Sequence, residues 1–198
     1  MLDTPQQDQV ADRIKLPFTF DVQKLEAEYE QLKLGGFVYY NVLQLRGPAH
    51  LIDPSIPPPT HQGEFADGSW TDWLDSKDLH RSPYLEEVAD FFKAHTKVTL
   101  VRLLRLSPNA VVKEHTDPTL ALEVERSVVR LTIPIFSPEA VLFYLNHTVV
   151  PMKEGECWYM RLTDPHKIEN FSDKERVNMT IDMIPNDWVR EQILSAQV

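Results

Sequence analysis

Residues 102–117 read Arg-Leu-Leu-Arg-Leu-Ser-Pro-Asn-Ala-Val-Val-Lys-Glu-His-Thr-Asp, and the fold expected for the chain follows from them. From Val98 to Leu106 the sequence is rich in leucine and β-branched residues, which indicates a strand. Ser107-Pro108-Asn109 is typical of a turn. A second short strand, residues 110–112, leads directly into His115-Thr-Asp117. The stretch therefore predicts two strands joined by a turn, with the polar residues His115 and Asp117 directly after the second strand.

His115 and Asp117 are two residues apart, and on an extended chain such residues point to the same side. An imidazole nitrogen and a carboxylate oxygen can then meet at one point, as in the facial triad that holds non-haem Fe(II). We take His166, in Asp164-Pro165-His166, as the candidate for the third ligand. The same spacing also arises where two polar residues occupy a strand-to-loop junction, so the motif alone leaves both interpretations open.

After residue 97 the sequence becomes a series of short, apolar-rich segments, most of them separated by turn signals. Many short strands at close spacing are typical of an all-β sandwich or barrel, and a jelly roll is the natural way to close one. We expect a mainly β protein with flanking helices, whose core strands are residues 98–106, 110–114, 127–136, 140–145, 148–152, 156–162 and 176–184.

The first 97 residues predict helices and loops that lead into this core. Asp21 can cap a helix that extends to Leu32, and Ser82 followed by Pro83 begins a second helix. The remaining expected segments are a loose lead-in (1–15), a strand (37–45) ended by Arg46-Gly47-Pro48, a long irregular loop (47–69) and a short terminal helix (186–194). The long loop either covers a site or is a solvent-exposed excursion.

We expect residues 1–198 to form one domain, with 1–97 as the helical and loop lead-in and 98–184 as the jelly-roll core. Residues 37–80 could line a substrate pocket, with Tyr39, Tyr40, Trp70 and Trp73 among them. The spacing of the two tryptophans, three residues apart, favours packing residues over substrate contacts.

Charge and composition exclude several classes of protein. The net charge of −10 argues against a nucleic-acid or anionic-membrane partner. The single cysteine, Cys157, rules out an internal disulfide and is expected to be a small buried hydrophobe in a reducing compartment. The sequence has no signal-peptide pattern and no apolar run of about 18 residues, so we expect a cytoplasmic protein with no membrane span.

Arginines inside apolar strands are the next notable feature. Arg176 begins the segment Arg-Val-Asn-Met-Thr-Ile-Asp-Met, ten residues after His166. A buried guanidinium needs an anion, and its planar fork suits a carboxylate. Arg130, Arg102 and Arg105 occupy similar positions. For each arginine the alternative is a salt bridge with one of the 30 acidic residues.

Several motifs follow one another in a fixed order: residues 101–110, His115-Thr-Asp117, 129–135, Gly155-Glu-Cys-Trp-Tyr, Pro165-His166 with Asn170, and Arg176 with Asp182. In these motifs residues from about 37 to 184 resemble the aspartyl/asparaginyl β-hydroxylase family of Fe(II)/2-oxoglutarate dioxygenases. Leu45-Arg46-Gly47 and Ser82-Pro83-Tyr84 also resemble segments of this family. Because Asp117 is present, the chain is similar to the small-molecule branch that includes proline cis-4-hydroxylase.

The resemblance implies a double-stranded β-helix, that is, a cupin-like jelly roll, with Fe(II) on His115, Asp117 and His166. It also implies 2-oxoglutarate as cosubstrate, O₂ as oxidant, and Arg176 as anchor for the distal carboxylate of 2-oxoglutarate. Arg130, Thr132 and Arg102 are the further candidate cosubstrate contacts. Thr132 replaces a histidine that many relatives have, and Asn178 replaces a second one.

We therefore expect a hydroxylase that oxidatively decarboxylates 2-oxoglutarate and hydroxylates an unactivated C–H of a free amino acid or natural-product carboxylic acid. The alternatives are a non-catalytic metabolite-binding β-sandwich with a vestigial metal site, a hydroxylase of peptidyl Asp or Asn, and a cupin-type dioxygenase without cosubstrate. The histidines not expected to be ligands are His50, His61, His80, His95 and His147.

Overall fold

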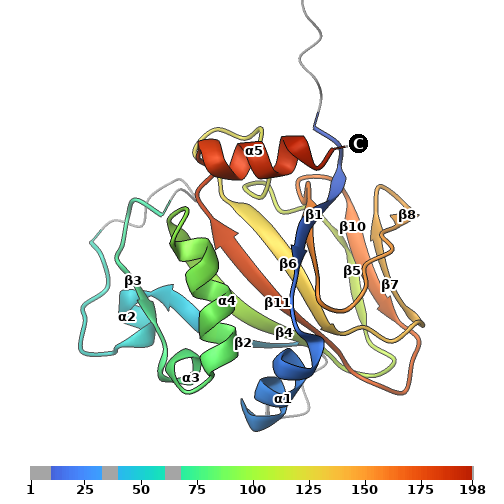
Figure 1. Cartoon of the computed structure of the whole chain (residues 1–198), viewed down its shortest axis with the longest axis horizontal. Coiled ribbons are helices and arrows are strands. Elements are labelled where there is room, and N and C mark those ends of the chain that lie inside the picture. The colour runs from blue at the N-terminus through green and yellow to red at the C-terminus, as the bar shows by residue number, and fades with distance from the viewer. Residues whose placement is uncertain (1–9, 33–39, 61–67, 198) are drawn as a thin grey trace, which may run out of the picture.

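The computed structural model describes residues 10–32, 40–60 and 68–197. Two antiparallel sheets face each other, and helices cover the outer face of the larger one (Figure 1). The larger sheet has seven strands, in the order β1 (Arg13–Thr19), β9 (Glu156–Met160), β6 (Val129–Phe136), β11 (Arg176–Met183), β4 (Val98–Leu106), β2 (Tyr40–Pro48) and β3 (Trp73–Asp75). The smaller has four, in the order β5 (Val111–His115), β10 (His166–Asn170), β7 (Val141–Leu145) and β8 (Thr148–Val149). This is the expected double-stranded β-helix, a mainly β fold with few helices.

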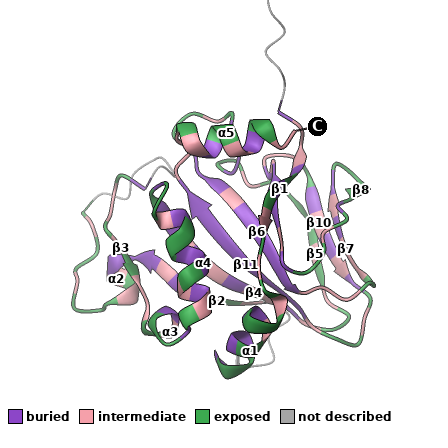
Figure 2. Ribbon diagram, in the orientation of Figure 1, coloured by how far each residue is buried: buried purple, intermediate pink, exposed green. Residues whose placement is uncertain are grey.

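Strand β11 lies at the centre of the large sheet and is buried along its whole length, as Figure 2 shows in purple. Its apolar residues alternate with polar ones, so each kind faces one side of the sheet. Val177, Met179, Ile181 and Met183 join the core beneath the helices. The polar face, residues 176, 178, 180 and 182, is turned toward the small sheet, which places functional groups inside the jelly roll.

The helices are fixed to the outer face by capping as well as by packing. Asp21 accepts a hydrogen bond from Lys24 N (3.2 Å) and begins α1 (Val22–Leu32), as predicted. Ser82 instead donates its hydroxyl to Asp78 O and does not cap α4 (Pro83–Lys93). The buried Glu28 of α1 accepts hydrogen bonds from the first backbone amides of α4, at 2.7 and 2.8 Å. A carboxylate at a helix N-terminus is favourable, so α1 holds α4 in place.

The remaining helices are short. They are α2 (Ala49–Ile52), α3 (Lys77–His80) and α5 (Asp187–Ser195), and Asn186 caps the last by accepting from Val189 N. None of the helices in the described ranges is long and apolar enough to cross a membrane.

The structure corrects several expectations for the first half of the chain. The lead-in contains β1, whose Ile14 and Leu16 are buried where the strand pairs with β9. Strand β2 continues through Arg46-Gly47-Pro48, and α2 lies within the expected loop 47–69. Because β1, β2 and β3 join the large sheet, the β core is not confined to residues 98–184. Tyr39, the side chain of Tyr40, His61 and residues 61–67 of the loop lie outside the described residues.

Strand β10 was also missed, because no strand was expected between residues 162 and 176. It pairs with β5 on one side and with β7 on the other. This position brings the two halves of the candidate metal motif together.

Candidate metal centre

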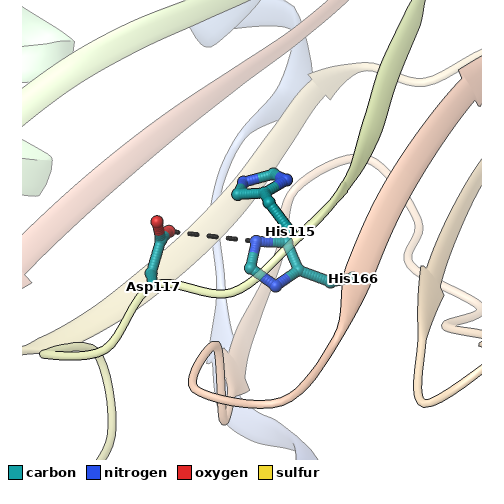
Figure 3. Close-up of side chains that lie close together, drawn as sticks. All are labelled: His115, Asp117 and His166. Atoms are coloured by element: carbon teal, nitrogen blue, oxygen red, sulfur yellow. Dashed lines mark ion pairs between the residues drawn. The ribbon is translucent and has the colours of Figure 1, made fainter.

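His115, Asp117 and His166 converge: the two-residue spacing predicted this for His115 and Asp117, and His166 was the candidate for the third position. His115 is the last residue of β5 and His166 the first of β10, and the two face each other in the antiparallel register. Their ring centroids are 4.2 Å apart. Asp117 follows β5 and points at the same place, with its Oδ2 3.8 Å from His166 Nε2 (Figure 3). One donor atom from each residue lies within 4.8 Å of those of the other two.

Backbone carbonyls set the tautomer of both histidines. His115 Nδ1 lies 2.8 Å from Lys113 O, and His166 Nδ1 lies 2.9 Å from Asp164 O. A carbonyl oxygen can only accept, so each Nδ1 carries the proton and each Nε2 presents its lone pair. Metal-binding histidines are commonly oriented in this way.

His166 is further prepared by burial. Removal from water lowers its pKa below the ordinary value of 6.5, and the nearby His115 and Arg130 add to this, while Asp164 O and Asp117 oppose it. Phe143 stacks on the ring at 5.9 Å between centroids and fixes its plane. His166 is therefore a neutral ligand at physiological pH and needs no proton removed before it binds a metal.

Asp117 is held by its own backbone and by a cation. Its amide donates to Leu162 O (2.8 Å), and Arg130 Nη1 lies 3.6 Å from its Oδ2. Two imidazoles and one carboxylate on a single face fit Fe(II), and they leave the remaining positions for small molecules. No second group of three metal-binding side chains occurs among residues 10–32, 40–60 and 68–197.

Four of the other histidines lie outside the group of three, and the buried Nδ1 of one of them, His50, has no hydrogen-bond partner among the described residues. His80 pairs with Glu86 (2.7 Å), His147 lies 3.4 Å from Glu114, His95 stacks on Trp188, and His50 lies against Trp70. His61 stays a prediction.

The three candidate ligands line a cavity of about 190 Å³ that opens to the surface beside the exposed His115. Arg176, only 3% exposed, lines the same cavity, with its guanidinium carbon 5.8 Å from the centroid of Phe143. Asn178 lies beside it: with its amide oxygen facing the guanidinium, it accepts from Arg176 Nη1 at 3.1 Å. Thr132 also lines this cavity. The three candidate metal ligands and the Arg176 guanidinium thus line the same pocket.

The other three arginines considered as cosubstrate anchors form salt bridges with carboxylates of the chain, which was the alternative interpretation of their positions. Arg130 lines the cavity but binds Asp182 with both Nε and Nη2 (2.7 and 2.8 Å). Arg102 Nη2 lies 3.3 Å from the same carboxylate and lines a neighbouring cavity instead. Arg105 pairs with Glu175.

Two polar residues of β11 were not singled out as site residues. Thr180 is 2% exposed and lines the cavity, and its hydroxyl has no hydrogen-bond partner among the described residues. Asp182 is the shared partner of Arg130 and Arg102. Both could have been found from the alternation of polar and apolar residues from Arg176 onward, had that pattern been interpreted as a buried strand with one functional face.

Comparisons with known proteins place this site in a class. The structure superposes on an oxidoreductase of the 2OG-Fe(II) oxygenase family from Burkholderia pseudomallei, with a TM-score of 0.53 and 12% identity over 88% of this chain and 85% of that one. At such identity the likeness shows the fold, which is that of the 2-oxoglutarate-dependent iron oxygenases.

The family itself follows from the sequence match. Residues 70–185 match the model of the aspartyl/asparaginyl beta-hydroxylase family, and the chain belongs to that family. It is 30% identical over 103 residues to L-proline cis-3-hydroxylase 2 from Streptomyces sp, and 27% identical over 100 residues to L-proline cis-4-hydroxylase from Rhizobium meliloti (strain 1021). Each alignment covers 50% of this chain but only 34% and 35% of the relatives, so the chain matches about a third of their length. His115, Asp117 and His166 are the candidate iron ligands of this 2-oxoglutarate oxygenase family member.

Proposed function

We propose that the protein is an Fe(II)/2-oxoglutarate-dependent hydroxylase of a small carboxylic acid, either a free amino acid or a natural-product acid. One observation carries the proposal: His115, Asp117 and His166 converge in the cavity that Arg176 also lines. Iron with bound 2-oxoglutarate and O₂ supplies the oxidising power for hydroxylation of an unactivated C–H, chemistry that no side chain can supply.

The residues of the chain have separate tasks in this scheme. His115 and His166 provide Nε2 atoms, and Asp117 provides a carboxylate oxygen. Arg176 binds the distal carboxylate of 2-oxoglutarate through its planar fork, and the Thr180 hydroxyl, which is buried in the same cavity, donates to the cosubstrate. Apolar side chains of the cavity keep bulk water away from the reacting groups; these are Leu104, Phe143, Met160, Leu162 and Ile168.

A small-molecule substrate is supported by the two curated relatives, whose names state hydroxylation of L-proline. The carboxylate ligand Asp117 also favours the small-molecule branch over hydroxylation of peptidyl Asp or Asn. A cupin-type dioxygenase without cosubstrate would leave Arg176 buried in the metal cavity with no role in catalysis.

The test uses purified protein loaded with Fe(II). Under anaerobic conditions, added 2-oxoglutarate should produce a visible charge-transfer band, and O₂ should then release succinate at a rate that a panel of free amino and other carboxylic acids stimulates. The His115→Ala variant is the control for adventitious iron. If the iron-loaded protein shows neither the band nor succinate, the proposed function is wrong.

A further inference from the structure

A second cavity, of about 410 Å³, adjoins the metal centre, and Arg176 is not among the residues that line it. Asp117 and Arg130 line both cavities, so the second one reaches a candidate iron ligand directly. A molecule bound there would lie beside the metal without displacing the cosubstrate. A third cavity, of about 620 Å³, is lined by neither Asp117 nor Arg130; its charged lining residues are four glutamates (26, 30, 154 and 175), Arg105 and Lys174. It has no connection to the chemistry.

The charges around the two connected cavities favour one more anion. Their ionised lining residues are three arginines (102, 130 and 176) and two aspartates (117 and 182). The charge of a divalent metal cancels that of the 2-oxoglutarate dianion. The lining side chains themselves then leave a net charge of +1, three arginines against two aspartates. Arg102 and Arg130 both contact Asp182. Two guanidinium groups against one carboxylate make the part of the second cavity near Asp182 positively charged. A monocarboxylate placed there would neutralise the site.

The opposite wall of the second cavity is apolar and aromatic. Trp70 and Trp73 meet edge to face, with ring centroids 5.7 Å apart, and both line the cavity. Trp73 Nε1 donates to Gly68 O (3.0 Å), so its polar atom is satisfied and its ring is fixed. Gly68 has a φ of +66°, and a Cβ there would lie 2.7 Å from Thr99 Cγ2. Glycine thus lets this loop approach Trp73 closely. Leu100, Leu120 and Val128 add aliphatic surface.

The two cavities also differ in size. The second has more than twice the volume of the first, about 410 against about 190 Å³. Proline has fewer non-hydrogen atoms than 2-oxoglutarate, so it would leave most of this space to water. The larger volume lies in the range of pockets for bigger ligands, roughly 300–1,000 Å³.

We propose that the second cavity binds the substrate to be hydroxylated, and that this substrate is a monocarboxylic acid with an aromatic or alicyclic body larger than proline. Its carboxylate lies at Arg102 and Arg130, and its ring lies against Trp70 and Trp73. The inference rests on the proposed function, because it takes the small cavity to be filled by 2-oxoglutarate.

Binding tests this inference without turnover. The full chain is loaded with Zn(II), which cannot perform the oxidation, and titrated calorimetrically first with 2-oxoglutarate and then with three probes. The probes are 3-phenylpropionate, its uncharged amide 3-phenylpropanamide, and L-proline. We expect the phenyl acid to bind at least tenfold more tightly than either the amide or proline. Equal affinities, or a phenyl acid that competes with 2-oxoglutarate, would overturn the inference.

Two substitutions assign the contacts. Trp70→Leu should weaken 3-phenylpropionate about tenfold and leave 2-oxoglutarate binding unchanged. Arg102→Met should abolish the preference for the acid over its amide, and Arg102→Lys should keep part of it; thermal unfolding confirms that each variant is folded. If neither Trp70→Leu nor Arg102→Met changes probe binding, the substrate does not occupy this cavity. Failure of the 2-oxoglutarate titration itself would instead contradict the proposed function.

Discussion

Arg130 and Asp182 lie directly opposite each other on β6 and β11 and form a two-point pair, Nε to Oδ1 at 2.7 Å and Nη2 to Oδ2 at 2.8 Å. The Asp182 side chain is only 2% exposed, so this is a buried ion pair. It leaves Nη1 directed toward Asp117, 3.6 Å away. The orientation of Asp117, a candidate iron ligand beside the small sheet, therefore depends on the carboxylate of Asp182, which is on β11 of the large sheet.

The Asp182→Asn substitution should strongly destabilise the fold. It leaves two guanidinium groups without the charge that compensates them, and breaking a buried pair typically costs about 3–5 kcal/mol. Urea unfolding measures this cost. Asp78→Asn is the matched control, because the Asp78–Arg81 pair is on the surface and should contribute less than about 1 kcal/mol. Equal effects of the two substitutions would contradict the buried-pair interpretation.

The His115→Ala substitution should abolish turnover and lower the affinity for Fe(II) by orders of magnitude. The reason is the convergence of its donor atom with those of Asp117 and His166. Metal content after dialysis and succinate release are the two measurements. His80→Ala, which changes an exposed histidine paired with Glu86, should behave like the wild type. Near-normal succinate release from His115→Ala would show that the metal is bound elsewhere.

The Arg176→Ala substitution should weaken 2-oxoglutarate binding by roughly 10²–10⁴-fold, since loss of one partner of a buried charge pair costs about 3–5 kcal/mol and each 1.4 kcal/mol is about tenfold. Arg176→Lys should lose less but not recover, because a point charge cannot reproduce the fork. Iron affinity should be retained. Calorimetric titration of the metal-loaded variants decides the matter, and unchanged 2-oxoglutarate binding in Arg176→Ala would make the residue structural.

Cys157 should be chemically inert. It is fully buried on β9, and burial raises the pKa of its thiol far above the ordinary value. Ellman's reagent should therefore label it only after unfolding, and Cys157→Ala should retain most activity. Cys157→Ser should be the less stable of the two variants, because an unsatisfied buried hydroxyl costs about 1–3 kcal/mol. Rapid labelling of the folded protein, or loss of turnover in a folded alanine variant, would be the contrary result.

Asp12 should contribute stability that disappears in acid. A two-point hydrogen bond from Arg13 lowers its pKa from 3.8 to about 2; burial opposes this shift, while Asn146 and Arg161 support it. A carboxyl whose pKa is lower in the folded state stabilises the fold above its ordinary pKa, and that contribution is lost as pH falls toward the folded value. At pH 6 the free energy of unfolding of the wild type should exceed that of Asp12→Asn by about 1 kcal/mol, less than the full pKa shift implies, because the ion pair is partly exposed and screened by solvent.

The measurement is urea unfolding of both proteins between pH 6 and pH 2.5. The gap between them should narrow as the solution becomes more acidic. A gap that stays constant over this range would mean that the Asp12 charge does not stabilise the fold.

The strands that bury apolar residues could be predicted from the sequence, because β-branched and leucine-rich runs carry that signal by themselves. Residues 98–106 were predicted as a strand with the bounds that β4 has. The pairing of His115 with Asp117 was also predictable, because the two-residue periodicity of an extended chain places both side chains on one side.

The sequence did not show which strands lie next to each other or which carboxylate each arginine binds. Strand β10 has only Ile168 as a buried apolar residue and is a strand because β5 and β7 lie on either side of it. In β1, Ile14, Leu16 and Phe18 alternate, and the strand tolerates Pro17 because it lies at the edge of the sheet beside β9. The partner of Arg130 is 52 positions away and is one of 30 acidic residues. Only the sheet register selects Asp182.

The two-faced burial of β11 limits how the chain can change in length. Insertion or deletion of one residue inside the strand would exchange its faces and drive the arginine, amide and carboxylate groups into the apolar core under the helices. The turn at residues 171–175 is itself held in place, because Asn170 Nδ2 donates to Lys174 O (2.8 Å) and Asn109 N donates to Ser172 O (3.2 Å). Evolution or engineering can therefore alter the chemistry along β11 by substitution far more readily than by a change in length.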